Sequence, residues 1–202
     1  MMVAILDYDA GNIRSVEKAA RLLGHEAVVT RKREEILFAD HVILPGVGAF
    51  GDAMDKLHRY GLVSVIRETV EKKIPFLGIC LGLQLMFESS EEAPGVEGLG
   101  LLPGKILRIP DGENLKIPHI GWNSLCFPNP GRLFQGIEEG AYVYFVHSYY
   151  LQADDPQIVK ASTEYGTLIH VSVERDCLFA CQFHPEKSSE TGLKILQNFL
   201  EV

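Results

Sequence analysis

The sequence predicts an α/β fold in which a central parallel sheet is flanked by helices. Short apolar runs at residues 3–6, 27–29, 42–44 and 76–79 alternate with helical patterns in the first half of the chain. Uninterrupted apolar strands are typical of a parallel sheet that is covered on both faces. In the second half, strand-like runs follow one another without long helices, so we expect antiparallel strands to be added to the sheet.

Helical periodicity places the elements that flank the sheet. Apolar residues recur at helical spacing over residues 13–23, with Asn12 at the N-cap position and Gly24 as the stop signal. A second helix is expected at residues 62–73 and a closing helix at residues 189–200, each with one apolar face. These helices are long enough to cover the predicted strands.

The second half of the chain is punctuated by Gly and Pro. Its expected strands span residues 105–109, 124–127, 142–150, 158–162, 168–174 and 178–183. A surface loop is expected at residues 89–100, which are rich in acids and glycines. We find no repeat, low-complexity segment or linker in the sequence, so residues 1–202 are expected to form a single domain.

The composition argues against several classes of partner. The chain has 202 residues, of which 47% are hydrophobic and 23% charged, as is usual for folded soluble proteins. Its net charge of -8 has the wrong sign for attraction to phosphate backbones or anionic lipid. The four cysteines form no CxxC pair, and neither a leader nor a long apolar run is evident. We therefore expect a cytoplasmic protein without a metal or cofactor.

A candidate nucleophile lies in a tight turn after a predicted strand. Gly78-Ile79-Cys80-Leu81-Gly82 precedes a helix expected at residues 83–88, which is the strand-turn-helix setting of a nucleophile elbow. Flanking glycines are needed there because a Cβ on either side would clash. The helix N-terminus and a partnered histidine both favour a thiolate. Cys80 is therefore the preferred nucleophile, with a buried structural cysteine as the alternative.

A thiol nucleophile needs a base, and the base needs an orienting group. Among the seven histidines, His184 lies at the end of the predicted strand 178–183 and is followed by Pro185 and Glu186. At that spacing Glu186 can accept a hydrogen bond from one imidazole nitrogen while the other faces Cys80. The alternative is an exposed His and Glu in a surface turn. The place after a strand favours a Cys-His-Glu triad.

Acyl transfer also develops an oxyanion, which backbone N–H groups commonly stabilise. The amide of Leu81, the residue after the nucleophile, is one candidate donor. The turn Pro45-Gly46-Val47-Gly48 follows another predicted strand, and its glycines allow a peptide plane to turn as charge develops. Both turns end parallel strands, where open α/β sheets place ligand sites. For the second turn, an ordinary connection from strand to helix is the alternative.

Taken together, these motifs resemble those of the triad-type, class I glutamine amidotransferases. The resemblance is carried by residues 78–84, residues 45–48 and Gln182-Phe183-His184-Pro185-Glu186. A finer set resembles the glutaminase subunits of imidazole glycerol phosphate synthase, an enzyme of histidine biosynthesis, over nearly the whole chain. That set comprises Asp7-Tyr8, Gly11-Asn12, residues 118–123, residues 144–149 and Pro185-Glu186-Lys187-Ser188. The resemblance implies a three-layer, flavodoxin-like sheet.

The resemblance also implies a mechanism of glutamine hydrolysis. The Cys80 thiolate attacks the side-chain amide carbon, His184 protonates the departing ammonia, and water releases glutamate from the thioester, while Glu186 orients His184. The implied oxyanion site consists of Val47, Gly48 and Leu81. The implied glutamine contacts are Gly46, Gln84, Ser148 and Tyr149. Without the resemblance, Gln84 would be assigned to an exposed helix surface and Tyr149 to core packing.

A partner is part of the implied function, because ammonia is a nucleophile only while it is unprotonated and has to be kept from bulk water. The resemblance implies a heterodimer with a (β/α)8 cyclase subunit, which makes imidazole glycerol phosphate and aminoimidazole-carboxamide ribonucleotide. Candidates for the docking face are Asn12, Trp122, Tyr144 and Lys187, with burial of Trp122 as a comparable alternative. We expect weak hydrolysis by the isolated chain and stimulation by the loaded cyclase through the turn at Val47.

Three other functions stay open from the sequence. The chain could serve another synthase, such as one for anthranilate or pyridoxal phosphate, although the motifs around Trp122 and Lys187 weigh against this. It could be a γ-glutamyl hydrolase or peptidase with the same triad. It could also be a catalytically idle homologue that acts only by binding, and the intact Cys80, His184 and Glu186 argue against that function.

Overall fold

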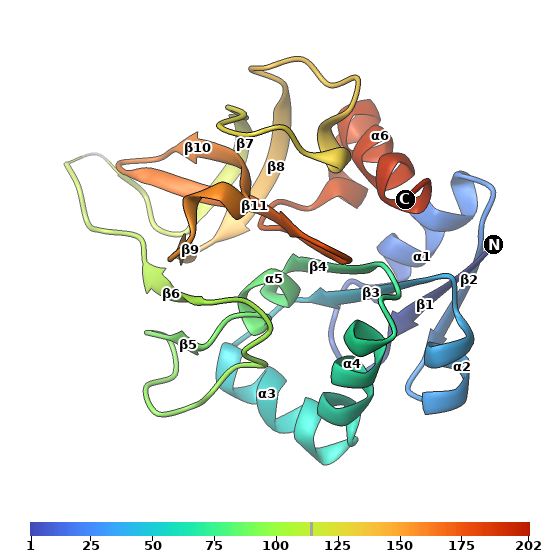
Figure 1. The fold of residues 1–202 in the computed structure, drawn as a ribbon. Coiled ribbons are helices and arrows are strands. Elements are labelled where there is room, and N and C mark those ends of the chain that lie inside the picture. Colours follow the sequence, from blue (N-terminus) through green and yellow to red (C-terminus); the bar gives the residue numbers. More distant parts are fainter. Residues whose placement is uncertain (114) are drawn as a thin grey trace.

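A mixed sheet forms the centre of the computed structural model, which describes residues 1–113 and 115–202 (Figure 1). Its strands lie in the order β2-β1-β3-β4-β12-β11-β9-β6-β5, with β10 paired to β11. The first five are parallel: β2 (Glu26–Thr30), β1 (Met2–Leu6), β3 (His41–Gly46), β4 (Phe76–Cys80) and β12 (Leu178–Cys181). The predicted α/β class is confirmed, and the order β2-β1-β3-β4 is the flavodoxin-like arrangement.

The strands of the second half divide between two sheets. Antiparallel pairing extends the main sheet through β11 (Leu168–Arg175), β10 (Val159–Glu164), β9 (Tyr149–Ala153) and β6 (Gly104–Arg108), and β6 pairs in parallel with β5 (Ser89–Ser90). A separate ribbon consists of β7 (His119–Ser124) and β8 (Tyr142–His147). The expectation that the later strands extend the sheet is thus right for most of them and wrong for this ribbon.

Two of the expected strands need correction. The run at residues 142–150, expected as one strand, is interrupted at Ser148. Its first part forms β8 in the ribbon and its last part begins β9 in the main sheet. The strand expected at residues 124–127 is wrong, because β7 ends at Ser124 and only an isolated bridge joins Cys126 to Ser162. The loop expected at residues 89–100 begins with the short strand β5.

Helices cover both faces of the main sheet. One face carries α1 (Ile13–Leu22), α6 (Ser189–Leu200) and the ribbon, packed on Val3, Ile5 and Ile43. The other carries α2 (Arg33–Phe38), α3 (Phe50–Arg59), α4 (Leu62–Glu71) and α5 (Leu81–Leu85), packed on Ala4, Leu6 and Val42. Alternate residues of each central strand therefore pack into two separate apolar cores. Because both faces are buried, the sequence of each strand is an uninterrupted apolar run.

The helix expectations hold for α1, α4 and α6 with small shifts at the ends. Gly24 adopts φ 85° directly after α1, as a helix stop requires. Asn12 occupies the N-cap position in a left-handed conformation, but its side chain donates its hydrogen bond elsewhere, to Glu186. The helix after Cys80 begins at Leu81 rather than at residue 83. Neither α2 nor α3 is predicted by the helical patterns of the sequence.

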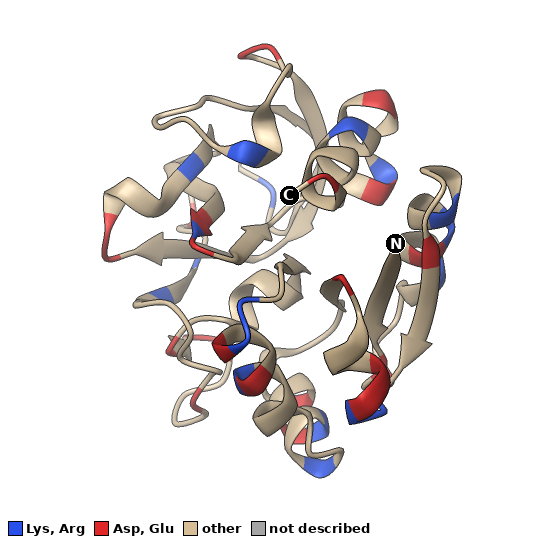
Figure 2. Ribbon diagram, turned by 45° about the vertical axis from the view of Figure 1, so that its right-hand side comes forward, with Lys and Arg blue, Asp and Glu red and all other residues tan. Residues whose placement is uncertain are grey.

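Charged residues lie mainly on the outer helices and loops, whereas β3 and β4 contain no Asp, Glu, Lys or Arg (Figure 2). Cations and anions are interspersed on the elements that Figure 2 shows. Across residues 1–113 and 115–202, no helix is sufficiently long and apolar to cross a bilayer. The same residues contain no cluster of three His, Cys, Asp or Glu side chains suited to a metal ion.

Glycine at two positions allows β4 to turn directly into α5. A Cβ on Gly78 would lie 2.7 Å from the carbonyl oxygen of Gly82, and a Cβ on Gly82 would collide with the carbonyl oxygen of Leu44 in β3. The turn is therefore packed against backbone on both sides, and backbone cannot rotate away as a flexible side chain can.

We predict that Gly82→Ala lowers the free energy of unfolding by about 3 kcal/mol, because the added methyl group forces α5 away from β3. Urea denaturation followed by circular dichroism measures the change. Gly51→Ala in α3 is the control, because its Cβ would lie 3.4 Å from the Cβ of Ala93, and it should stay within about 1 kcal/mol of the wild type. Equal stability of both variants would contradict the packing argument.

Candidate active site

Cys80 lies at the tip of the turn between β4 and α5. Its backbone has φ 55° and ψ -110°, a conformation that side chains other than glycine rarely adopt. Such a conformation costs about 1–3 kcal/mol and persists only where the surroundings enforce it. Here the close packing around Gly78 and Gly82 supplies that enforcement. The turn has the geometry of the nucleophile elbow that the sequence predicts.

His184 and Glu186 form a buried pair beside this turn. β12 lies next to β4 in the sheet, and His184 follows its last residues, anchored by a hydrogen bond from its backbone N–H to the carbonyl of Tyr144 (3.0 Å). The 3-10 turn Pro185–Lys187 then brings Glu186 back toward the imidazole. Nδ1 of His184 lies 2.8 Å from Oε1 of Glu186, and the two side chains are 1% and 0% exposed.

The surroundings of His184 favour its charged form. Burial lowers the pKa of His184, but the interactions with Cys80 and Glu186 outweigh burial and raise the pKa to about 9. Within the described parts of the chain, Nε2 of His184 has no hydrogen-bond partner. A protonated imidazole held by Glu186 on one side and unpaired on the other is an arrangement suited to giving a proton to a bound substrate.

Asn12 contacts the same carboxylate. Its Nδ2 donates a 2.5 Å hydrogen bond to Oε1 of Glu186, the oxygen that also faces His184. A Cβ on the preceding Gly11 would lie 2.8 Å from Cγ2 of Val47. The loop between β1 and α1 therefore touches both the histidine-carboxylate pair and the turn after β3.

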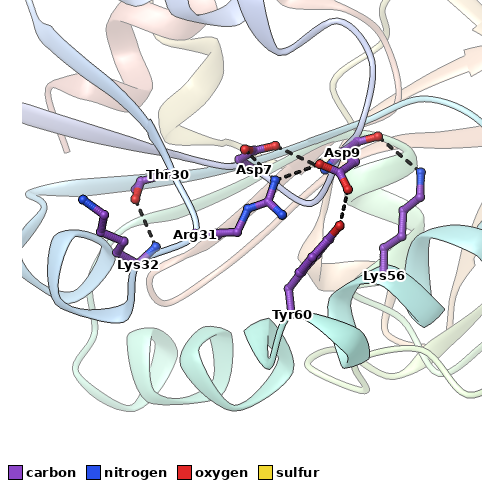
Figure 3. Close-up of polar contacts among 7 residues, drawn as sticks. All are labelled: Asp7, Asp9, Thr30, Arg31, Lys32, Lys56 and Tyr60. Carbon is purple, nitrogen blue, oxygen red and sulfur yellow. Dashed lines mark hydrogen bonds and ion pairs between the residues drawn. The ribbon is translucent and has the colours of Figure 1, made fainter.

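A cluster of charged residues braces this loop (Figure 3). Arg31 forms 2.7 Å ion pairs with both Asp7 and Asp9, and its guanidinium lies 4.1 Å from the centre of the Tyr60 ring. The Tyr60 hydroxyl and Arg31 donate to Asp9, and these hydrogen bonds lower the pKa of that carboxyl. The brace fixes the loop against α3 at the carboxyl ends of the parallel strands.

A cavity of about 340 Å³ opens over Cys80 and His184. This volume is at the small end of the range for ligand pockets and is suited to a molecule the size of an amino acid. The predicted site residues that line it are Val47, Gly48, Cys80, Leu81, Gln84, Ser148, Tyr149 and His184. Gly46 pairs with Cys80 in the β3–β4 register, and a Cβ there would collide with the hydroxyl of Tyr8.

The sequence of the chain matches one family model over nearly its whole length. The model of the family "Glutamine amidotransferase class-I" matches residues 4–202. The chain belongs to this family. It is therefore a glutamine amidotransferase, as the motifs around Cys80 and His184 predict.

Curated relatives place this amidotransferase more closely. Imidazole glycerol phosphate synthase subunit HisH of Moorella thermoacetica is 54% identical over 200 residues, which cover 99% of this chain and 94% of that protein. The HisH subunits of Aquifex aeolicus (50% identical; 98% and 96% covered) and Methanocaldococcus jannaschii (47%; 100% and 100%) are also similar. At this identity and coverage the chain belongs to the HisH family.

Solved structures share the fold at low sequence identity. A structure described as a glutamine amidotransferase superposes with a TM-score of 0.77 at 23% identity and covers 98% of this chain and 97% of its own. PurLQS from Thermotoga maritima superposes with a TM-score of 0.76 at 21% identity, with 99% and 97% covered. The fold is thus shared by solved structures whose sequences differ widely from that of this chain.

The cavity over Cys80 is also lined by residues that the sequence does not predict. Glu92, Pro118, Val146 and His147 line it together with the expected residues. His147 is buried and its pKa is lowered to about 4 by burial, so it is neutral at pH 7. The motif around residues 144–149 contains His147, but nothing in a single sequence distinguishes a pocket histidine from an ordinary strand residue.

We predict that replacing the carboxylate in Glu186→Gln lowers the pKa of His184 by at least about one unit, because burial then acts with less opposition. Titration of the histidine resonances by NMR measures this value against about 9 in the wild type. His119 and His147, whose pKa values are lowered to about 4 by burial, are internal references that stay neutral over the same range. An unchanged pKa of His184 in Glu186→Gln would contradict the stated effect of the Glu186 carboxylate.

The same shift makes stability depend on pH. The pKa of His184 is higher in the folded chain than its ordinary value of 6.5. Its contribution to the free energy of unfolding is therefore complete below pH 6.5 and is lost as the pH rises through 9. The stability difference between wild type and Glu186→Gln should accordingly be larger near pH 6 than near pH 10.

Proposed function

We propose that this chain hydrolyses L-glutamine to glutamate and ammonia at Cys80, His184 and Glu186, and supplies the ammonia to a cyclase subunit in histidine biosynthesis. One observation carries the proposal: a strained cysteine lines the same small cavity as the histidine of a buried histidine-carboxylate pair. The names of the HisH relatives, subunits of imidazole glycerol phosphate synthase, support the synthase assignment.

The reaction begins when the Cys80 thiolate attacks the side-chain amide carbon of glutamine. The carbon-nitrogen bond then breaks as the protonated His184 gives its Nε2 proton to the departing nitrogen, which leaves as ammonia. A water molecule next attacks the thioester and passes a proton to the neutral His184. Glutamate leaves, and the thiolate and charged imidazole are restored. Glu186 keeps Nδ1 of His184 protonated and fixes the ring throughout.

The walls of the cavity hold the substrate and the developing charge. The backbone amide of Leu81 begins α5 directly after the nucleophile and is the first oxyanion donor. The turn with Val47 and Gly48 is the second, and its Gly48 has φ 101°. Gln84, Ser148 and Tyr149 contact the α-amino and carboxylate groups of glutamine, while Gly46 leaves room for the turn against Tyr8.

The cyclase subunit docks on the ribbon beside the cavity in a heterodimer. Trp122 and Tyr144 are opposite each other in the β7–β8 register, and their rings form an edge contact with centroids 6.0 Å apart. Trp122 is 49% exposed, so its alternative placement in the core does not hold. Tyr144 also accepts the main-chain hydrogen bond from His184, so the proposed face adjoins the proposed base. Exposed Lys187 lies in the same 3-10 turn as Glu186.

Ammonia passes from the cavity to the partner through the edge that is lined by Val146 of the ribbon and by Pro118, the residue before β7. The cytoplasmic location expected from the sequence remains a prediction, as does the single-domain boundary at residues 1–202. Competing synthases such as those for anthranilate are disfavoured because the HisH relatives match the entire chain. Complementation of a histidine auxotroph separates these functions in the cell.

We predict that the purified chain releases glutamate slowly alone and at least about 100-fold faster with the cyclase subunit and its nucleotide ligand, because docking sets the turn at Val47. Cys80→Ala should remove release in both conditions, because Cys80 is the only cysteine that lines the described cavity. Glutamate dehydrogenase coupling measures the rate.

Cys126→Ala is the matched control for the loss of a thiol, because Cys126 is exposed and lies outside the cavity. It should keep the wild-type rate. Glutamate release that survives Cys80→Ala would rule out the proposed nucleophile, and full activity without the partner would rule out the gating.

We predict that Trp122→Ala raises the dissociation constant for the cyclase subunit at least about tenfold, as truncation of an aromatic anchor does at other interfaces. Isothermal titration calorimetry measures the constant. Phe38→Ala is the control, because Phe38 is 83% exposed on α2, over the opposite face of the sheet. Equal affinities for both variants would place the interface elsewhere.

A further inference from the structure

A chain of buried hydrogen bonds begins at the carbonyl oxygen of Tyr149. This oxygen accepts from Nε2 of Gln84 at 3.1 Å and lies 2.9 Å from Nδ1 of His147. A backbone carbonyl can only accept, so both nitrogens that face it carry hydrogen. The oxygen of Tyr149 therefore determines the orientation of the Gln84 amide and the tautomer of His147.

The orientation passes from Gln84 to a second buried amide. The same Nε2 of Gln84 lies 3.0 Å from Oε1 of Gln182. Because Nε2 is a donor, the atom of Gln182 that faces it has to be the oxygen. The NH₂ group of Gln182 therefore points the other way, and it lies 3.6 Å from the sulfur of Cys80.

The position of Gln182 follows from the sheet. Cys181 pairs with Ile79 in the parallel β12–β4 register, so the next residues, Gln182 and Cys80, leave their strands side by side. Gln182 is 0% exposed, and its backbone N–H donates to the carbonyl of Val171. A polar side chain that is completely buried and aimed at the sulfur is not explained by core packing, where an apolar residue would serve.

We propose that Gln182 is a positioning residue that donates an N–H hydrogen bond to the Cys80 thiolate and holds the sulfur toward His184. The inference rests on the proposed role of Cys80 as nucleophile. A buried thiolate has little access to water, so a fixed amide donor replaces part of its hydration. Loss of the donor disfavours the charged sulfur.

The other titratable groups around Cys80 do not obscure the effect of Gln182 on the Cys80 sulfur. His147 stays neutral, because burial lowers its pKa to about 4. Burial raises the pKa of Tyr8 and of Cys181 above their ordinary values, so both stay uncharged. The remaining titratable groups are His184 with its neighbour Glu186, together with Glu92 and Tyr149 on the cavity wall, and they are the same in the wild type and in Gln182 variants.

The test is the pH profile of Cys80 alkylation by iodoacetamide, read by mass spectrometry of the peptide that contains residue 80. In Gln182→Met, which keeps the length of the side chain, the midpoint should rise by about one pH unit, with about tenfold slower alkylation at pH 7. Gln182→Glu keeps the shape but turns an oxygen toward the sulfur, and its midpoint should rise at least as far.

Asn198→Leu is the matched control. Asn198 is another buried amide, and its Nδ2 donates to the carbonyls of Leu133 and Gln135, away from the cavity. In Asn198→Leu the midpoint of the pH profile of Cys80 alkylation should equal that of the wild type. Folded Gln182 variants with the wild-type midpoint would overturn the proposal, since a merely structural amide does not move this profile.

A measurement on the wild type keeps the proposal testable if the variants fail to fold. The side-chain NH₂ resonances of Gln182 should shift at the same pH midpoint as the alkylation of Cys80, and those of Asn198 should not. NH₂ resonances of Gln182 that stay constant through this midpoint would overturn the proposal. Neither measurement uses glutamine, so a chain without glutaminase activity can still pass this test.

Discussion

The backbone strain at Cys80 is the constraint on which the rest of the site depends. A side chain held at positive φ points out of the sheet, but only tight packing can hold it there. Gly78 and Gly82 let β4 and α5 meet, and Gly46 lets the end of β3 lie against Leu81 and Tyr8. Strand order then completes the site, because β12 is the next neighbour of β4 and delivers His184 to the same edge.

Burial acts in opposite directions on the histidines of the cavity. His147 has no acid beside it, and desolvation leaves it neutral. His184 is equally hidden from water, but Glu186 and Cys80 compensate for the lost hydration of its charged form. Two imidazoles on the wall of one cavity thus differ in charge because of a single carboxylate and a thiol. The difference between His184, the proposed proton donor, and the neutral His147 lies in these neighbours and not in exposure.

The sequence predicts the chemical centre better than its surroundings, for physical reasons. The elbow at Cys80 and the pair His184-Glu186 depend on local backbone geometry. That geometry is determined by residues that are adjacent in the sequence, so the sequence predicts it. The break at Ser148 depends on which sheets β8 and β9 join, and that is decided by distant strands. The contact from Asn12 to Glu186 spans 174 positions. Gln182 stands within the recognised motif, but only the neighbouring strand shows where its amide points.

The β7–β8 ribbon has a consequence for how such enzymes diversify. It is hydrogen-bonded as a sheet of its own, and its residues alternate between the buried wall of His119, Phe145 and His147 and the exposed side of Ile120, Trp122 and Tyr142. Substitutions on the outer side of the ribbon do not alter the hydrogen bonds of β4 with β3 and β12 in the main sheet. In the proposed arrangement, substitutions on the outer side change the partner and leave the residues around Cys80 unchanged, so that partner recognition and catalysis can evolve separately in one chain.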